Sequence, residues 1–309
     1  MSIVVVFEPP NASVDIVFVN GWSANGQPWT TGSKETAACW PKSILPNLLP
    51  QARIILFQYE ANVEDFWAVS SKNEIDSYAQ DLLGGVVDLR TKTKTNDRLV
   101  IFVAHSIGGI VCERAIVRAQ TGSPGQQEFV KHVKRIAFMG TPFHTNKMKW
   151  TETGKVFFQL AGCNAPLDDD LSKSEKLTEF CDRFLDFTKA KKDIEIAIFY
   201  ERRETELGGT DVILAGEEAV KIPGCPDPSG LKATHQGLAE VASQKDDHFK
   251  RGLLRQLSSW VNQATEAKAD DAKKGQYNIS FDGKNYGLQI GNNPGRVEGV
   301  DIRNKETES

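Results

Sequence analysis

The stretch that decides the fold of this chain is Leu99-Val100-Ile101-Phe102-Val103-Ala104-His105-Ser106-Ile107-Gly108-Gly109. Its leading apolar residues predict a strand buried on both faces, and the glycines after Ser106 predict a sharp turn into a helix. Such a corner is a nucleophile elbow, which pushes the serine hydroxyl beyond the sheet and frees the next backbone N–H for an oxyanion. Ala104 replaces the first glycine of the usual G-x-S-x-G pattern, so this stretch alone also fits an ordinary strand end.

Composition narrows the possible functions. Of the 309 residues, 40% are apolar and 25% are charged, and the formal net charge is −4, so nothing electrostatic favours a nucleic-acid partner. The five cysteines are widely spaced and form no C-x-x-C pair, which predicts a reduced, cytoplasmic setting without a zinc site. We expect no metal and no cofactor. The N-terminus lacks a signal-peptide pattern, and no apolar run is long enough to span a bilayer.

Strand-like and helix-like segments alternate along the chain. This alternation predicts a mostly parallel sheet with helices on both faces. The segment 150–190 interrupts the alternation, and its aromatic side chains either line an acyl site or simply pack against the sheet. Strands are expected at 1–7, 14–19, 52–59, 99–105, 133–139 and 194–200, with 211–214 as the last, and helices at about 74–90, after Ser106, and at about 247–262.

Serine catalysis requires two further groups. A serine hydroxyl is a poor nucleophile until a histidine accepts its proton, and a carboxylate must fix that histidine's tautomer. Of the five histidines, only His235 lies in the loop after the last expected strand, where the base belongs. The end of the preceding strand offers Glu201 first and Glu204 second, with Glu217 and Glu218 farther away. The alternative for Glu201 is a surface carboxylate paired with a neighbouring arginine.

The second expected strand ends in Asn20-Gly21-Trp22. In α/β-hydrolases the loop at this place supplies the second backbone N–H of the oxyanion hole. Asn20 stands where histidine is commoner, but the contact would come from the backbone that follows it. The expected oxyanion donors are therefore the N–H groups of Ile107 and Trp22.

Short motifs across residues 12 to 262 resemble the lipase/serine-esterase domain found at the N-terminus of many fungal NLR-type receptors. The resemblance implies an α/β-hydrolase fold with Ser106, Glu201 and His235 as the triad, and Ile107 with Trp22 at the oxyanion hole. The chain departs from the family pattern at Asn20, Ala104, Ile107 and Thr234, none of which removes a triad group. The motifs are Asn20-Gly21-Trp22, Trp29-Thr30, Trp40-Pro41, Leu45-Pro46, Leu49-Pro50, Ala52-Arg53-Ile54, Tyr59-Glu60-Ala61-Asn62, His105-Ser106-Ile107-Gly108-Gly109, Gly140-Thr141-Pro142, Phe199-Tyr200-Glu201 and Ala233-Thr234-His235.

The C-terminal segment differs from the rest in composition. Apolar and polar residues alternate from Tyr277 onward between Gly/Asn turns, and so few apolar residues cannot form a stable fold alone. If copies of this segment stacked in register, each strand would pair with the same strand of the copy above it and of the copy below it. Its spacing of Gly287, Gln289, Gly291 and Asn293 resembles the sigma-class amyloid signalling motif of fungal NLR-associated effectors, which implies self-assembly templated by an NLR-type receptor. The alternatives are a disordered tail and a β-hairpin annexed to the domain.

The sequence therefore predicts an α/β-hydrolase domain over 1–264, a linker over 265–276, and a largely disordered, β-prone amyloid-type tail over 277–309. The expected activity is cleavage of an acyl ester of a lipid through an acyl-enzyme on Ser106. The expected setting is a cytoplasmic cell-death or incompatibility effector, recruited to a membrane surface when its tail assembles. Two alternatives stay open, a catalytically silent scaffold for signalling or oligomerisation and a peptidase or thioesterase, because a fold does not name its substrate.

Overall fold

The computed structural model describes residues 1–22, 28–31, 38–61, 74–145, 147–160, 174–207 and 209–274. The chain divides into one unit over Met1–Thr265 and a second over Glu266–Ser309. Of the second unit only the helical residues up to Lys274 are described. The amyloid-type tail predicted over 277–309 lies outside the described residues, as does part of the 150–190 segment, and the predicted domain boundaries stay predictions.

Strands and helices alternate through the first unit. Up to the elbow they are β1 (Ser2–Phe7), β2 (Val14–Val19), β3 (Thr30–Thr31), β4 (Ala38–Cys39), α1 (Trp40–Ser43), α2 (Leu45–Leu48), β5 (Ala52–Gln58), α4 (Glu74–Lys92) and β6 (Leu99–His105). After it come α5 (Gly108–Ala119), α6 (Pro124–His132), β7 (Val133–Met139), α7 (Lys147–Leu160), α8 (Ser174–Ala190), β8 (Glu195–Glu201), β9 (Thr205–Leu207), β10 (Thr210–Val212), α9 (Glu217–Val220), β11 (Ser229–Leu231), α10 (Asp247–Phe249) and α11 (Arg255–Lys274).

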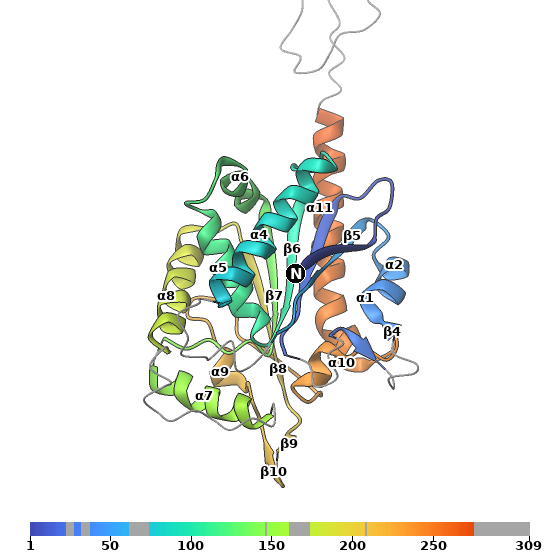
Figure 1. The fold of residues 1–309 in the computed structure, drawn as a ribbon. Coiled ribbons are helices and arrows are strands. Elements are labelled where there is room, and N and C mark those ends of the chain that lie inside the picture. The colour runs from blue at the N-terminus through green and yellow to red at the C-terminus, as the bar shows by residue number, and fades with distance from the viewer. Residues whose placement is uncertain are drawn as a thin grey trace, which may run out of the picture. The chain divides into compact units, whose positions relative to one another are not determined.

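The main sheet is mostly parallel, as the alternation predicted. Its strand order is β1-β5-β2-β6-β7-β8-β11, and only β1 runs antiparallel to its neighbour. Helices cover both faces, with α4, α5 and α8 on one side and α1, α2 and α11 on the other (Figure 1). Parallel pairing brings the carboxyl ends of β2, β6, β7 and β8 to one edge, where ligand sites of open α/β sheets lie.

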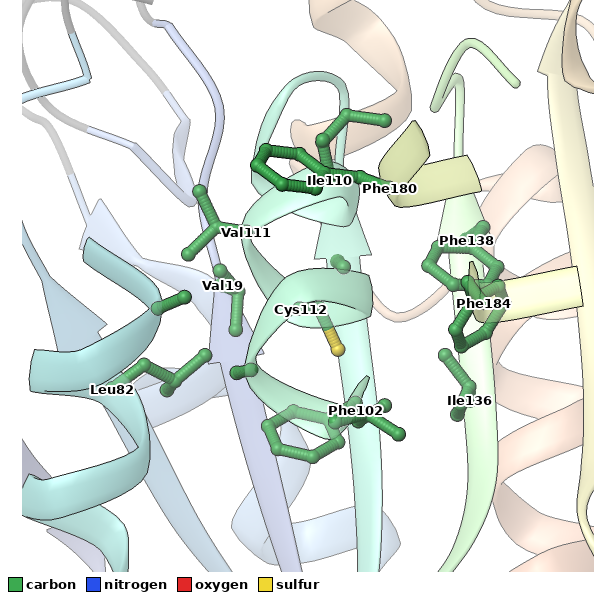
Figure 2. Packing of buried hydrophobic residues seen from close by; sticks show 14 of the residues in the cluster. Val19, Leu82, Phe102, Ile110, Val111, Cys112, Ile136, Phe138, Phe180 and Phe184 are labelled. Carbon is green, nitrogen blue, oxygen red and sulfur yellow. The ribbon is translucent and has the colours of Figure 1, made fainter. Parts of the chain in front are cut away.

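Two buried apolar clusters fasten the helices to the sheet. On one face, Phe102 and Phe138 of the strands pack with side chains of α4, α5 and α8 (Figure 2). On the other face, Phe18 packs with Trp40 and with Trp260 of α11. The elbow strand β6 contributes alternate residues to both clusters, which explains its uninterrupted apolar run.

A buried ion cluster joins β2 and β5 away from the elbow. Asp15 pairs in register with Arg53, whose Nε and Nη2 donate hydrogen bonds of 2.9 and 2.8 Å to the two carboxylate oxygens. Arg90 of α4 donates a further bond of 2.5 Å to Asp15 Oδ2. All three side chains are buried, and Asp15 is the carboxylate that Arg53 and Arg90 share.

One predicted strand lies outside the main sheet. The segment 211–214 was expected to be the last strand, but Thr210–Val212 instead pairs with Thr205–Leu207 in a separate two-stranded hairpin. The last strand of the main sheet is β11, which pairs in parallel with β8. The prediction failed because Ser229–Leu231 is only three residues long and lacks an apolar run, while the hairpin strand looks like a sheet strand in isolation.

Candidate active site

Ser106 stands at a strained corner between β6 and α5. Its φ of 53° lies in the left-handed region, which non-glycine residues adopt rarely and mostly at functional positions. The corner is held by the Ser106 N–H, which donates to Met139 O at 2.9 Å, and by Thr141 Oγ1, which donates to Ser106 O at 3.0 Å. This geometry is that of a nucleophile elbow.

The glycines after Ser106 are required by close approach. A Cβ on Gly108 would lie 2.2 Å from the backbone oxygen of Asn20, and one on Gly109 would lie 2.1 Å from Thr141 Oγ1. A larger residue at position 108 would therefore push the elbow away from the loop after β2, and one at position 109 would collide with Thr141, which follows β7.

The structure brings Ser106, His235 and Glu201 together in one buried hydrogen-bonded chain. His235 Nε2 lies 2.8 Å from Ser106 Oγ, and His235 Nδ1 lies 3.3 Å from Glu201 Oε2. A carboxylate oxygen only accepts, so Nδ1 carries the proton and Nε2 is free to accept one from the serine. The three groups come from the β6–α5 corner, the loop after β11 and the end of β8, and each residue is at most 2% exposed.

The alternative carboxylates lie apart from this chain. Glu204 is exposed beyond the end of β8. Glu217, in α9, accepts a hydrogen bond from the Tyr200 hydroxyl at 3.0 Å, and Glu218 is exposed. Glu201 is therefore the carboxylate that the fold places beside His235.

Glu201 is kept in its charged form. Burial alone would raise its pKa, but attraction to His235 and the hydrogen bonds from His235 and from the Ala215 N–H together lower the pKa below its ordinary value. The Ala215 N–H donates to Oε1 at 2.6 Å, which leaves Oε2 for the histidine. An ionised carboxylate at this place can stabilise an imidazolium.

A second histidine touches the same loop. His105 Nε2 lies 2.9 Å from the backbone oxygen of His235, and the two rings are 5.1 Å apart. Burial, reinforced by repulsion from His235, lowers the pKa of His105 to about 3, so its ring is neutral near pH 7. Because a carbonyl oxygen only accepts, Nε2 of His105 carries the proton. Sequence reasoning missed this contact, since 130 residues separate the partners.

The loop after β2 lies directly on the elbow. A Cβ on Gly21 would lie 2.6 Å from Ser106 Cβ and 3.2 Å from its Oγ. The loop is fixed by the Tyr59 hydroxyl, which donates to Asn20 O at 2.5 Å, and by Asn20 Nδ2, which donates to Gly21 O at 3.0 Å. Within the described ranges, no backbone carbonyl accepts a hydrogen bond from the N–H of Trp22 or of Ile107.

The aromatic residues of the 150–190 segment that the structure describes are mostly core. Trp150, Phe157, Phe158, Phe180 and Phe184 are buried in the cluster on the α5 side of the sheet. Phe157 in addition sets its ring edge-on to His235, with the ring centres 5.5 Å apart. For these residues the packing alternative holds.

Two further observations bear on cofactors and membranes. Within the described ranges, no three His, Cys, Asp or Glu side chains are grouped so as to hold a metal ion. In the same part of the chain, no helix has the length and apolar character needed to cross a bilayer.

Fold and elbow together define an α/β-hydrolase. Residues 11–144 match the family model described as "Putative serine esterase (DUF676)", a match that ends before the positions of His235 and Glu201. The match covers β2 to the loop after β7 and includes the elbow at Ser106.

The chain is also similar to part of several curated proteins. It is 25% identical over 209 residues to "Protein SERAC1" of Homo sapiens, with 63% of this chain and 31% of that protein covered. It is 27% identical over 218 residues to "Protein SERAC1" of Danio rerio, with 70% of this chain and 32% of that protein covered. The chain therefore spans about a third of the length of these relatives.

Solved structures with a similar arrangement include the lipase BlEst2 of Bacillus licheniformis, at a TM-score of 0.46 and 15% identity, with 75% of this chain and 89% of that chain covered. A carboxylesterase structure from Nitrososphaera gargenis has a TM-score of 0.45 and 13% identity, with 83% and 93% covered.

Proposed function

We propose that this chain cleaves an acyl ester, of a lipid, through a covalent acyl-enzyme on Ser106. In this proposal His235 is the general base and acid, Glu201 orients and stabilises it, and the N–H groups of Ile107 and Trp22 bind the oxyanion. The observation that carries the proposal is the buried chain from Ser106 Oγ through His235 to Glu201, with separations of 2.8 and 3.3 Å.

The reaction follows from this arrangement in two halves. His235 Nε2 takes the Ser106 proton while Oγ attacks the ester carbonyl carbon, and the carbonyl oxygen becomes an oxyanion that the two N–H groups bind. When the tetrahedral intermediate collapses, the alkoxide leaves with the proton from His235. A water molecule then gives a proton to His235 and attacks the acyl carbon, which releases the acid and restores the Ser106 hydroxyl.

The low pKa of Glu201 supports its role in these steps. An imidazolium forms twice in each cycle, and each time it lies against a carboxylate that is already charged. Burial of the pair strengthens the attraction, because water does not screen it.

Labelling by a fluorophosphonate tests the proposal directly. The purified full chain should react in its wild-type form, and both Ser106→Ala and His235→Ala should abolish labelling, because one lacks the nucleophile and the other its base. Ser259→Ala, at an exposed serine of α11, is the matched control and should label like wild type. A well-folded wild type that does not label would instead support the scaffold alternative.

The setting of the activity is the second part of the proposal. We infer a cytoplasmic cell-death or incompatibility effector whose residues 277–309 self-assemble on a matching motif of an NLR-type receptor and bring the hydrolase to a membrane surface. Support comes from the alternating sequence of this segment and from its sigma-type spacing. Deletion of 277–309 should abolish assembly and cell toxicity while fluorophosphonate labelling persists, and unchanged toxicity would contradict the proposal.

A further inference from the structure

Gly21 approaches the elbow more closely than a residue with a side chain can. A Cβ at this position would lie 2.6 Å from Ser106 Cβ and 2.7 Å from the backbone oxygen of His105. Both distances are shorter than real Cβ contacts, so the packing of the loop after β2 against Ser106 requires a glycine here. The backbone that continues from Gly21 to Trp22 therefore begins beside Ser106.

The same glycine leaves the next peptide bond with little restriction of its own. A peptide plane turns through ψ of the residue before it and φ of the residue after it, and glycine restricts ψ less than other residues do. The peptide is trans, so its C=O and N–H point in opposite directions. A half turn of the Gly21–Trp22 peptide would thus replace the Trp22 N–H by the Gly21 carbonyl oxygen, which repels an oxyanion.

The side chain of Asn20 opposes that turn. Its Nδ2 donates a hydrogen bond of 3.0 Å to Gly21 O, and no other described residue donates a backbone hydrogen bond to this oxygen. Because Gly21 O is held toward the Asn20 amide, the Trp22 N–H points in the opposite direction. In the described part of the chain no backbone carbonyl accepts from that N–H, so none competes with an oxyanion for it.

Asn20 is itself held in place from two sides. Its backbone oxygen accepts the 2.5 Å hydrogen bond from the Tyr59 hydroxyl, and the Tyr59 ring stacks on Phe57 with ring centres 4.9 Å apart. From the other side Gly108 of α5 comes so close that a Cβ there would lie 2.2 Å from the same oxygen. The residue is only 4% exposed. A side chain on a backbone fixed in this way can hold its partner in one geometry.

The chemistry of the amide separates its role from that of His235. An asparagine side chain has no acid or base form, so Asn20 adds no titrating group to the site. Its contribution therefore concerns where an N–H points and leaves proton transfer to His235.

We propose that Asn20 is a positioning residue, which holds the Gly21–Trp22 peptide in the orientation that offers the Trp22 N–H to the oxyanion. The inference rests on the proposed esterase function. It adds the side chain that compensates for the freedom of the glycine that the elbow requires.

Asn20→Leu tests the proposal, because leucine has nearly the same shape and no donor. Removing an oxyanion donor outright costs about 10²- to 10³-fold in kcat, and loosening one should cost less, about 10- to 100-fold. KM for a p-nitrophenyl ester should stay near the wild-type value, because the lost interaction is made in the transition state. The pH dependence of kcat/KM, set by His235, should not shift. Asn262→Leu, at an exposed asparagine of α11, is the matched control and should behave like wild type.

A trifluoromethyl ketone with ¹³C at its carbonyl reports on the oxyanion itself. Ser106 Oγ adds to that carbon, His235 takes the serine proton, and the former carbonyl oxygen becomes the hemiketal oxyanion. The ¹³C shift of hexyl trifluoromethyl ketone bound to the full chain shows at which pH this oxygen takes up a proton. In Asn20→Leu that pH should rise by about one unit or more, because the anion loses an aligned donor. An unchanged kcat and an unchanged ¹³C titration in Asn20→Leu would overturn the proposal.

Rescue distinguishes hydrogen bonding from packing. Histidine carries Nδ1 on Cγ, as asparagine carries its amide nitrogen, so Asn20→His keeps a donor at the same place and should recover most of the lost kcat. A folded Asn20→His as slow as Asn20→Leu would overturn the proposal. Urea unfolding checks each variant, and Asn20→Ala takes the place of Asn20→Leu if the latter does not fold.

The wild type separates this inference from the function on which it rests. If wild type neither reacts with a fluorophosphonate nor forms the hemiketal, the proposed function fails. If it does both and Asn20→Leu matches it in kcat and in the ¹³C titration, only the role of Asn20 fails.

Discussion

His105 Nε2 lies 2.9 Å from the backbone oxygen of His235, so the residue that precedes the elbow serine holds the loop of the neighbouring histidine. The contact links the position of the His235 loop to that of the strand end that carries Ser106. It does so without adding charge, because burial lowers the pKa of His105 to about 3.

Replacing His105 should disturb that alignment. His105→Phe removes the hydrogen bond but keeps a ring, and we expect kcat to fall about 10- to 100-fold as His235 shifts relative to Ser106. KM should change little, because His105 Nε2 is already engaged by the backbone oxygen of His235. His132→Phe, at a half-exposed histidine beside Glu128, is the matched control. An unchanged kcat in His105→Phe would mean that the loop is held by other contacts.

The carboxylate assignment predicts a sharp contrast. Glu201→Gln removes the charge that stabilises the imidazolium and should lower kcat by up to about 10⁴-fold, the effect of the corresponding change in serine proteases. Glu204→Gln, three residues along and exposed, should leave kcat unchanged. Steady-state kinetics on a p-nitrophenyl ester distinguish the two, and a large loss in Glu204→Gln alone would reverse the assignment.

Glu113 of α5 should couple stability to pH. It is buried, its Oε1 has no hydrogen-bond partner among the described residues, and burial raises its pKa well above the ordinary value. The folded protein therefore holds a proton that the unfolded chain releases. This contribution to stability is present below the unfolded pKa and is lost as pH rises toward the folded pKa.

Glu113→Gln removes this proton linkage. Relative to wild type, the variant's free energy of unfolding should gain about 1.4 kcal/mol for each pH unit above the unfolded value, until the folded pKa is reached. Urea unfolding at several pH values measures the difference, and Glu152→Gln, on the exposed side of α7, is the control. A difference that does not vary with pH would show that Glu113 is ionised in the folded protein.

The buried ion cluster predicts a large loss of stability from a small change. Asp15→Asn leaves Arg53 and Arg90 buried without their shared counter-charge, and we expect the free energy of unfolding to fall by about 3–5 kcal/mol. Glu8→Gln is the control, because this partly exposed partner of Arg53 contributes at most about 1 kcal/mol. Urea unfolding checks both. A small effect of Asp15→Asn would mean that water enters the cluster.

Features set by local sequence were predictable. The sheet follows from apolar runs such as Val14–Val19 and Leu99–His105, each buried as expected. The elbow follows from Gly108 and Gly109, whose lack of a Cβ permits a close approach that no other residue allows. The proximity of His235 to Ser106 follows from chain order in this fold, because the carboxyl ends of parallel strands meet at one edge.

Features set by contacts between distant segments were not predictable. Nothing near Tyr59 in the sequence indicates that its hydroxyl holds the backbone of Asn20. The strand β11 was missed because its pairing with β8, and not its own composition, makes it a strand. The aromatic residues Trp150 and Phe157 were equally compatible with a cavity and with the core, and only packing decides between them.

The parallel sheet has a consequence for how the protein is made. Ser106, Glu201 and His235 meet in space although they are spread over more than a hundred residues of chain. A ribosome completes the elbow long before it reaches the loop that follows β11. During synthesis the growing polypeptide therefore carries Ser106 before His235 exists, and the proposed reactivity toward esters can arise only once the later strands have emerged and docked.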